Sequence, residues 1–247
     1  MLHEWLLEHR KTEADYWWFI NKRRMVRRLL AQHQPERGTL LEVGCGGGLL
    51  SSRLQEEGWR VISSDLFPDA ARFARAHGVA HALAFNAAAG WPFVAASVDA
   101  VIMLDVLEHV QDDLTCLREA WRVLQPGGVL LITVPAYPFL YSAWDEYNGH
   151  FRRYTARSLA RAARASGFEI DRNTYWNAVS LPPAFLLRLK DRIQKVKLEH
   201  LEFPKVSRPL NRTLQVYGRL ECAWIQRCAL PFGLSAMAVL RKERSTA

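Results

Sequence analysis

Residues 40–50 read LLEVGCGGGLL, and this stretch decides the fold of the chain. The apolar run 40–43 has the length and composition of a buried strand. The glycines after it let the backbone turn sharply and come close to a ligand, and residues 49–54 then open a helix whose amide groups face that ligand. A strand, a glycine-rich turn and a helix in this order predict a site for a cofactor that carries a nucleoside.

An acidic residue follows at the spacing that such a site needs. Asp65 lies at the end of the next apolar run, and a carboxylate about 20 residues after the first glycine can accept both ribose hydroxyls. The turn has the pattern G-x-G-x-G, whereas NAD and FAD sites typically have G-x-G-x-x-G. Glu42, just before Gly44, would repel a pyrophosphate but tolerate the sulfonium and ammonium groups of S-adenosylmethionine.

The segment E-x-G-C-G-x-G at 42–48 is similar to motif I of the class I S-adenosylmethionine-dependent methyltransferases. Further segments resemble this family, or an uncharacterised bacterial subgroup of methyltransferase type 11/23 within it: W-W-F at 17–19, D-x-L-E-H-V at 105–110, L-x-P-G-G at 124–128, H-x-x-R-Y-T at 150–155 and L-P-F-G-L-S at 230–235. The resemblance therefore extends over nearly the whole chain. The subgroup brings no defined substrate with it.

The resemblance implies an α/β fold with a Rossmann-like, mostly parallel sheet of seven strands and helices on both faces. The strands are expected at residues 40–43, 61–66, 82–85, 98–104, 129–134, 168–175 and 234–240. Helices are expected at 68–76, where Pro68 marks the start, and at 117–124. An N-terminal helical cap over residues 1–34 would precede the methyltransferase domain at 35–247, in a single domain overall. Typical members join the last two strands by a short turn, whereas residues 177–231 would here form a basic and apolar helical insertion.

The resemblance also implies which residues bind the cofactor, S-adenosyl-L-methionine, and its product, S-adenosyl-L-homocysteine. They lie at strand ends and in the loops that follow: Glu42, Gly44, Cys45, Gly46, Gly48, Asp65, Leu66, Asn86, Ala87 and Asp105. Asn86 stands where the family usually has an aspartate, and its side-chain oxygen can still accept a hydrogen bond from the adenine amino group. In the leading helix, Arg24 or its neighbour Arg23 is expected to pair with the methionine carboxylate.

Methyl transfer needs mainly correct positioning, because the sulfonium is already a good leaving group. A hydroxyl acceptor also needs a general base, and histidine is the natural one near neutral pH. His150 is the first candidate, because its loop is expected beside the ligand crevice, and His109 is the second. For both, a role in shaping or holding the loop around them stays open as an alternative. The loop that holds His150 also supplies three candidates for substrate binding: Tyr147, Arg152 and Tyr154.

Metal-assisted transfer is an alternative for the segment that holds His109. Asp105, Glu108 and His109 fall at i, i+3 and i+4, which would place three ligands on one face of a helix, and some family members with E-x-x-E-H bind magnesium there. The first residue here is the shorter aspartate, and D-x-L-E-H-V usually occurs without a metal. We therefore expect no metal at the site.

Composition and charge limit the remaining possibilities for the class of protein and its location. With 49% hydrophobic residues among 247, the chain can bury one sizeable core, and it shows neither a membrane-span run of roughly 18 to 20 apolar residues nor the layout of a signal peptide. A cytoplasmic enzyme is therefore expected. Residues 188–247 hold 13 Lys and Arg against 5 Asp and Glu, next to apolar stretches.

This basic and apolar character suits a lipid-linked substrate, or a peripheral contact with an anionic membrane through residues 177–231. A solvated helix face is the alternative. Nucleic acid is not expected as a partner, because no interleaved aromatic and basic residues match a known reader module.

The predicted function is S-adenosylmethionine-dependent O-methylation of a small-molecule or glycolipid-type acceptor. Two alternatives from other classes stay open. One is an NAD-dependent Rossmann enzyme, which Glu42 and the glycine spacing disfavour. The other is a non-catalytic adenosyl-binding or membrane-adaptor protein, which the basic insertion and the lack of a certain base would suit.

Overall fold

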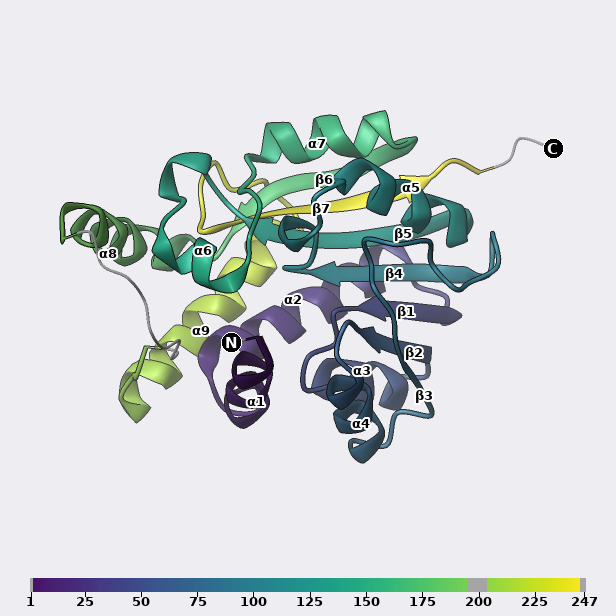
Figure 1. Cartoon of the computed structure of the whole chain (residues 1–247), viewed down its shortest axis with the longest axis horizontal. Coiled ribbons are helices and arrows are strands. Elements are labelled where there is room, and N and C mark those ends of the chain that lie inside the picture. Colours follow the sequence, from purple (N-terminus) through teal and green to yellow (C-terminus); the bar gives the residue numbers. More distant parts are fainter. Residues whose placement is uncertain (1, 195–203, 245–247) are drawn as a thin grey trace.

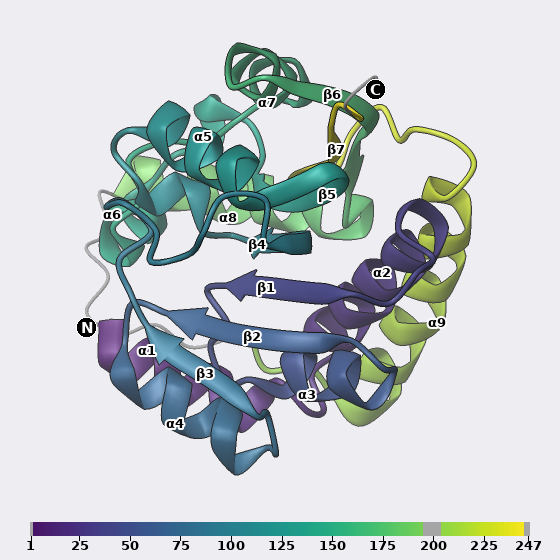
Figure 2. The ribbon, with the colours of Figure 1, turned by 90° about the vertical axis from the view of Figure 1, so that its right-hand side faces the viewer.

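A twisted sheet runs through the middle of the protein, with helices on both of its faces (Figures 1 and 2). The computed structural model describes residues 2–194 and 204–244. Within these residues the sheet has seven strands in the order β3-β2-β1-β4-β5-β7-β6, and β7 alone runs antiparallel to its neighbours. The predicted fold class is thereby confirmed.

The strands are β1 (Thr39–Val43), β2 (Arg60–Asp65), β3 (His81–Ala84), β4 (Val98–Leu104), β5 (Leu124–Pro135), β6 (Phe168–Trp176) and β7 (Ser235–Lys242). The α-helices are α1 (Leu2–Thr12), α2 (Trp17–His33), α3 (Leu49–Glu56), α4 (Pro68–Ala76), α5 (Asp113–Val123), α6 (Ala143–Asn148), α7 (Ala156–Ala165), α8 (Leu181–Gln194) and α9 (Arg208–Ile225). Three short 3₁₀ helices are η1 (Leu107–His109), η2 (Pro138–Leu140) and η3 (Ala178–Ser180).

Alternation along the central strands divides the core into two layers, because successive side chains of a strand point to opposite faces. Leu40 and Ile102 belong to the layer beneath α2, α3, α4 and α9, whereas Leu41 and Val101 belong to the layer beneath α5 and α7. Figure 2 shows these two sets of helices on opposite sides of the sheet. Both faces of the central strands are apolar, as buried parallel strands require.

Some boundaries differ from the expected ones. Helix α5 begins at Asp113, four residues before the expected start, because Asp112 caps it and accepts a hydrogen bond from the Thr115 amide at 3.0 Å. Strand β5 begins at Leu124 and includes the P-G-G turn, whose residues we expected before the strand. Helix α1 was not distinguished from the rest of the N-terminal region.

The insertion contributes α8 and α9, and its residues 195–203 lie outside the described part of the chain. Helix α9 packs along α2, where Gly218 lies so close to the Asn21 side chain that any β-carbon would collide with it. Cys222 and Ile225 are buried on the same face of α9. Among the described residues, no helix is both long and apolar enough to cross a membrane.

Candidate active site

The glycine-rich loop between β1 and α3 forms a sharp turn over the end of β2. Gly44, Gly46 and Gly48 all have positive φ angles, of 81°, 55° and 85°, which residues with a β-carbon rarely adopt. The amide of Gly44 donates a 2.8 Å hydrogen bond to the Ser64 carbonyl. The turn therefore lies at the carboxyl end of the sheet, where open α/β sheets bind their ligands.

Asp65 is held against this turn by the backbone. Its Oδ2 accepts a hydrogen bond from the Gly46 amide at 3.0 Å, and its Oδ1 accepts one from the Phe67 amide at 3.1 Å. Burial nevertheless raises the pKa of Asp65 above its ordinary value. The carboxylate thus lies beside the glycine turn, where a ribose would reach it, and Leu66 follows it with its side chain half exposed.

A small cavity of about 50 Å³ lies in front of the turn. The sheet and its loops contribute Glu42, Gly44, Cys45, Leu50 and Leu104 to its lining, and the N-terminal helices with the turn between them contribute His9, Glu13, Phe19, Lys22 and Arg23. A β-carbon on Gly46 would lie 2.8 Å from the His9 ring, and one on Gly47 would collide with the Glu13 carboxyl group. Side chains of the N-terminal region therefore fill the space over the glycines.

Burial governs the protonation of the acidic groups in this cavity. It raises the pKa of Glu42 to about 8 and that of Glu13 to about 7. The Glu42 carboxyl accepts a hydrogen bond from the Ser51 hydroxyl. Glu42 is consequently protonated for the most part at pH 7, so the charge argument against a pyrophosphate is weaker than the sequence suggested.

Lys22 is a cation of the leading helix that reaches this cavity, whereas the guanidinium of Arg24 points away from it. The Arg24 guanidinium donates to the Asn21 side chain at 2.7 Å and to the Gln215 carbonyl at 3.3 Å, which turns it toward α9. Arg23 lines the cavity but is tied to the carbonyls of Glu13 and Ala14. Positions 22 to 24 differ by 100° steps around α2, so the direction of each cation depends on how that helix packs.

Lys22 forms a buried ion pair with Asp105 at the end of β4. Its Nζ lies 2.5 Å from Asp105 Oδ2 and 3.8 Å from the centre of the Trp18 ring. Asp105 also accepts a 3.0 Å hydrogen bond from Thr133 and has a φ of +56°. Burial alone would raise the pKa of Asp105, but the charge and hydrogen bond of Lys22, with the bond from Thr133, lower it.

The expected adenine contacts lie on the loop after β3. The side-chain oxygen of Asn86 accepts a 2.9 Å hydrogen bond from the Ala88 amide, so it stabilises its own turn. The Ala87 carbonyl accepts one from the Trp91 indole at 3.2 Å. Both residues keep their place as predicted adenine contacts, with Asn86 already using part of its acceptor capacity.

His150 forms a buried pair with Asp145, an acid that the sequence analysis did not single out. The His150 Nδ1 lies 2.8 Å from Asp145 Oδ1, and Arg153 Nε donates to the same oxygen at 2.8 Å. Burial alone would raise the pKa of Asp145, but the hydrogen bonds and charges of His150 and Arg153 hold it below its ordinary value. The only signal in the sequence was an aspartate five residues before the histidine, across a glycine.

His109 packs edge-on against His150, with ring centres 4.6 Å apart. Desolvation and the nearby His150 lower the pKa of His109 to about 4. A base of that pKa is weak at neutral pH. The lowered pKa therefore counts against His109 as the general base.

Two of the predicted substrate residues bind Asp113 at the start of α5. The Tyr154 side chain is buried, and its hydroxyl donates to Asp113 Oδ2 at 2.8 Å. Arg152 pairs with the same carboxylate at 3.1 Å. Both side chains fasten the loop to α5, and their contact with a substrate stays a prediction. Tyr147 lies half-buried on α6, the helix that carries Asp145.

The metal arrangement considered from the sequence does not form. Asp105 has a positive φ, lies before the 3₁₀ helix η1 and is paired with Lys22. It therefore does not share an α-helical face with Glu108 and His109. A different set does come together, since ligand-capable atoms of Glu108, His109 and His150 all lie within 4.8 Å of one another.

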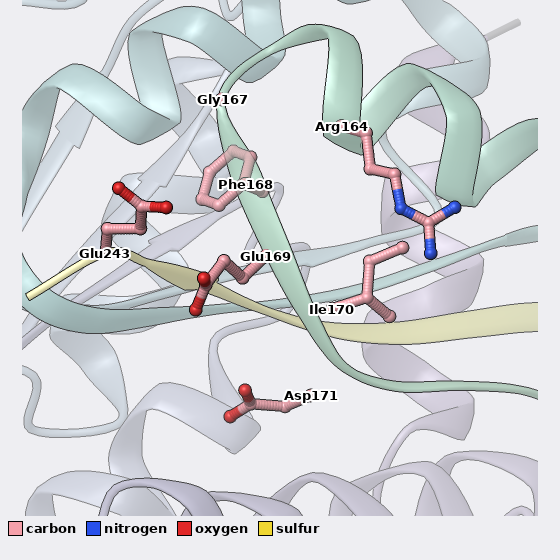
Figure 3. Close-up of a pocket in the computed structure, with 7 residues that line it drawn as sticks. All are labelled: Arg164, Gly167, Phe168, Glu169, Ile170, Asp171 and Glu243. Atoms are coloured by element: carbon pink, nitrogen blue, oxygen red, sulfur yellow. The ribbon is translucent and has the colours of Figure 1, made fainter.

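A larger hollow of about 640 Å³ lies elsewhere on the surface (Figure 3). Its lining comes from the end of α7, the start of β6 and the residue after β7: Arg164, Gly167, Phe168, Glu169, Ile170, Asp171 and Glu243. The start of β6 is the edge of the sheet opposite to the glycine turn, whereas sheets of this kind bind ligands at the carboxyl ends of their strands. The hollow contains none of the predicted site residues.

Residues 9–173, more than half of the chain, match a family model described as a methyltransferase domain. The chain belongs to the class I S-adenosylmethionine-dependent methyltransferases. The resemblance inferred from the sequence motifs is confirmed, and so is S-adenosylmethionine as the cofactor of the family.

Relatives of this methyltransferase differ in how much of the chain they match. A Mycolicibacterium smegmatis protein, named a probable S-adenosylmethionine-dependent methyltransferase, is 30% identical over 162 residues, which are 65% of this chain and 62% of that protein. A ubiquinone biosynthesis O-methyltransferase of Xanthomonas campestris pv. campestris is 36% identical over 102 residues, which are 38% of this chain and 41% of that enzyme. The chain thus matches less than two thirds of either relative's length.

Solved structures share the fold of this methyltransferase at low sequence identity. An S-adenosylmethionine-dependent methyltransferase from Mesorhizobium loti has a TM-score of 0.59 and 16% identity, and the match covers 88% of this chain and 98% of that one.

The residues of this methyltransferase fit the family's cofactor. The glycines leave a space that the side chains of His9 and Glu13 occupy and that a β-carbon on Gly46 or Gly47 would also enter. The carboxylate of Asp65 lies against the Gly46 amide, and Lys22 lines the cavity beside the turn.

Proposed function

We propose that this methyltransferase transfers the methyl group of S-adenosylmethionine to a hydroxyl oxygen of a small-molecule or glycolipid-type acceptor. The pairing of His150 with buried Asp145 carries the proposal. A carboxylate on Nδ1 keeps the proton on that nitrogen, which leaves Nε2 able to take a proton from the acceptor. The O-methyltransferase named among the relatives supports the choice of oxygen.

Each residue has a defined part in this reaction. The cofactor supplies an activated methyl group. Asp65 and the amides of the glycine turn bind its ribose end, and Lys22 binds its methionine carboxylate. His150 accepts the proton of the acceptor hydroxyl at Nε2, and the Asp145 carboxylate stabilises the imidazolium that forms, while Arg153 holds that carboxylate in place and keeps it ionised. No metal takes part in the proposed reaction. The cluster of Glu108, His109 and His150 contributes by proton transfer, in which His150 is the acceptor.

The composition of the insertion supports a proposal for the acceptor and the location. We propose that the protein is cytoplasmic and that residues 177–231 bring it into peripheral contact with an anionic membrane, where a lipid-linked acceptor would be available. The basic excess of residues 188–247 supports this.

Parallel calorimetric titration with S-adenosylmethionine, S-adenosylhomocysteine and NAD tests the cofactor. We expect micromolar binding of the first two and none of NAD. Binding of NAD alone would support the alternative of an NAD-dependent Rossmann enzyme. Transfer of labelled methyl groups to a pool of hydroxylated acceptors then tests the activity, and cofactor binding without transfer to any acceptor would support a non-catalytic adenosyl-binding protein.

Chelation tests the metal-free mechanism. Activity should be the same after exhaustive dialysis against EDTA as before it. A loss that magnesium, manganese or zinc restores would instead assign the Glu108, His109 and His150 cluster to a cation.

A further inference from the structure

Helix α9 carries an apolar stripe on the surface that faces away from the protein. Val216, Leu220 and Trp224 are 55%, 68% and 58% exposed. They fall at i, i+4 and i+8 on the helix, so they form one continuous row. A surface helix normally presents polar side chains on its outer face, and an exposed apolar row is typical of an interaction site.

The stripe is fixed in this outward direction because the opposite face of α9 is buried against the rest of the protein. Gly218, Cys222 and Ile225 are buried toward α2. Glu221 is also buried, and its carboxylate accepts hydrogen bonds from the amides of Asn177 at 3.0 Å and Ala178 at 2.8 Å. Rotation of α9 to bury the stripe would break all of these contacts.

A row of cations lies along one side of the stripe. At 100° per residue, the exposed Arg208, Arg212 and Arg219 lie within about 40° of one another on the helix, next to Val216. Glu221 is the one acidic residue in the sequence of α9, and it is buried. The outer surface of α9 therefore combines apolar side chains with positive charge and holds no negative charge.

An anionic bilayer complements both parts of this surface. Lipid phosphates can accept hydrogen bonds from the arginines, the acyl boundary can receive the valine and leucine, and tryptophan favours the interface between them. A second copy of the chain is a poorer match, because two such surfaces would bring their arginine rows into one interface.

The position of α9 relates this surface to the active site. Figure 1 shows α8 and α9 on the side of the sheet at which β4 ends, the side of the glycine turn and α6. Helix α8 also exposes Leu186 and Leu189 there, at 64% and 45%.

We propose that the outer face of α9, formed by Val216, Leu220 and Trp224 with Arg208, Arg212 and Arg219, docks on an anionic phospholipid bilayer. This deepens the peripheral contact proposed for the insertion, and it is independent of the methyl-transfer chemistry.

Flotation of the full-length protein with vesicles tests the docking without cofactor or acceptor. The wild type should float with vesicles of phosphatidylglycerol and phosphatidylcholine, bind phosphatidylcholine vesicles weakly, and lose most binding in high salt. The double variant Leu220→Glu with Trp224→Glu should bind the anionic vesicles at least about tenfold more weakly than the wild type. The triple variant Arg208→Gln, Arg212→Gln, Arg219→Gln should lose the preference for anionic lipid.

The control is Val94→Glu, which adds a charge at a side chain that is 78% exposed outside the insertion. It should float like the wild type, and circular dichroism should show that every variant is folded. Equal flotation of the wild type and the Leu220 and Trp224 double variant would overturn the proposal. So would a concentration-dependent dimer that this double variant abolishes, because the stripe would then be a contact between copies.

Discussion

The glycine turn with Asp65, which is the proposed cofactor side of the site, and His150 with its partners, which is the proposed acceptor side, are held in place by different kinds of group. On the cofactor side, backbone groups fix the geometry, since positive-φ glycines form the turn and the Gly46 amide holds Asp65. On the acceptor side, paired side chains fix it, with Asp145 binding His150 and Arg153. A site made by backbone is predictable from residue types, whereas a site made by side chains depends on which partner each of them meets.

Substitution at the glycine turn should break the cofactor side most severely. Gly46→Arg should abolish measurable binding of S-adenosylhomocysteine, because the site requires a φ of +55° and has no room for a side chain. Isothermal titration checks this. Gly78→Arg is the matched control, since Gly78 also has a positive φ of 85° but nothing within 4 Å of its position. Equal binding by both variants would contradict the site.

Removal of the base tests the acceptor side. His150→Ala should lower kcat by about 10²- to 10⁴-fold, because proton removal from the acceptor hydroxyl loses its catalyst. Steady-state kinetics with a labelled methyl group measure this, and the affinity for S-adenosylmethionine should stay unchanged. His109→Ala should cost much less, as expected for a histidine with a pKa of about 4. Full turnover by the His150 variant would refute its assignment as the base.

Substitutions at Lys22 and Arg24 test which cation of α2 binds the cofactor, a choice that the sequence could not make. Lys22→Met should weaken S-adenosylhomocysteine binding by about tenfold or more, because a charge-assisted bond to the carboxylate is lost. Binding of 5′-methylthioadenosine, which lacks that carboxylate, should change little. Arg24→Met is the control and should leave both affinities as they are, since Arg24 faces α9. A loss of the same size for both ligands would mean that Lys22 acts only by shaping the pocket.

The smallest expected effect is a pH dependence that arises from Glu42. Its pKa of about 8 should fall when a cationic cofactor binds nearby, so binding releases a proton and affinity rises with pH. If the pKa falls to about 7, the affinity for S-adenosylmethionine should rise about fivefold from pH 6 to pH 8. Calorimetry in buffers of different ionisation heat measures the proton release. Glu42→Gln should remove this component, and an unchanged profile in that variant would assign the dependence to another group.

Much of the fold was predictable because it depends on local pattern. The positions of β2, β4 and α4 agree with the sequence, since apolar runs and a proline at a helix start act within a few residues. The start of α5 was missed because a single capping side chain, Asp112, decided it. The early start of β5 was missed because it depends on the pairing of Leu124 with Val98 of β4, across an irregularity in the register that no local pattern specifies.

The sequence by itself determined the class of fold and the contact between the glycine turn and Asp65, because glycines, alternating apolar residues and an acid at fixed spacing act through the backbone of adjacent elements. Only the tertiary structure decided which cation of α2 faces the cavity, that Tyr154 belongs to the core, and that Asp145 orients His150. It also decided which side of α9 is exposed. These features depend on long-range packing and on the direction of single side chains, which no local pattern specifies.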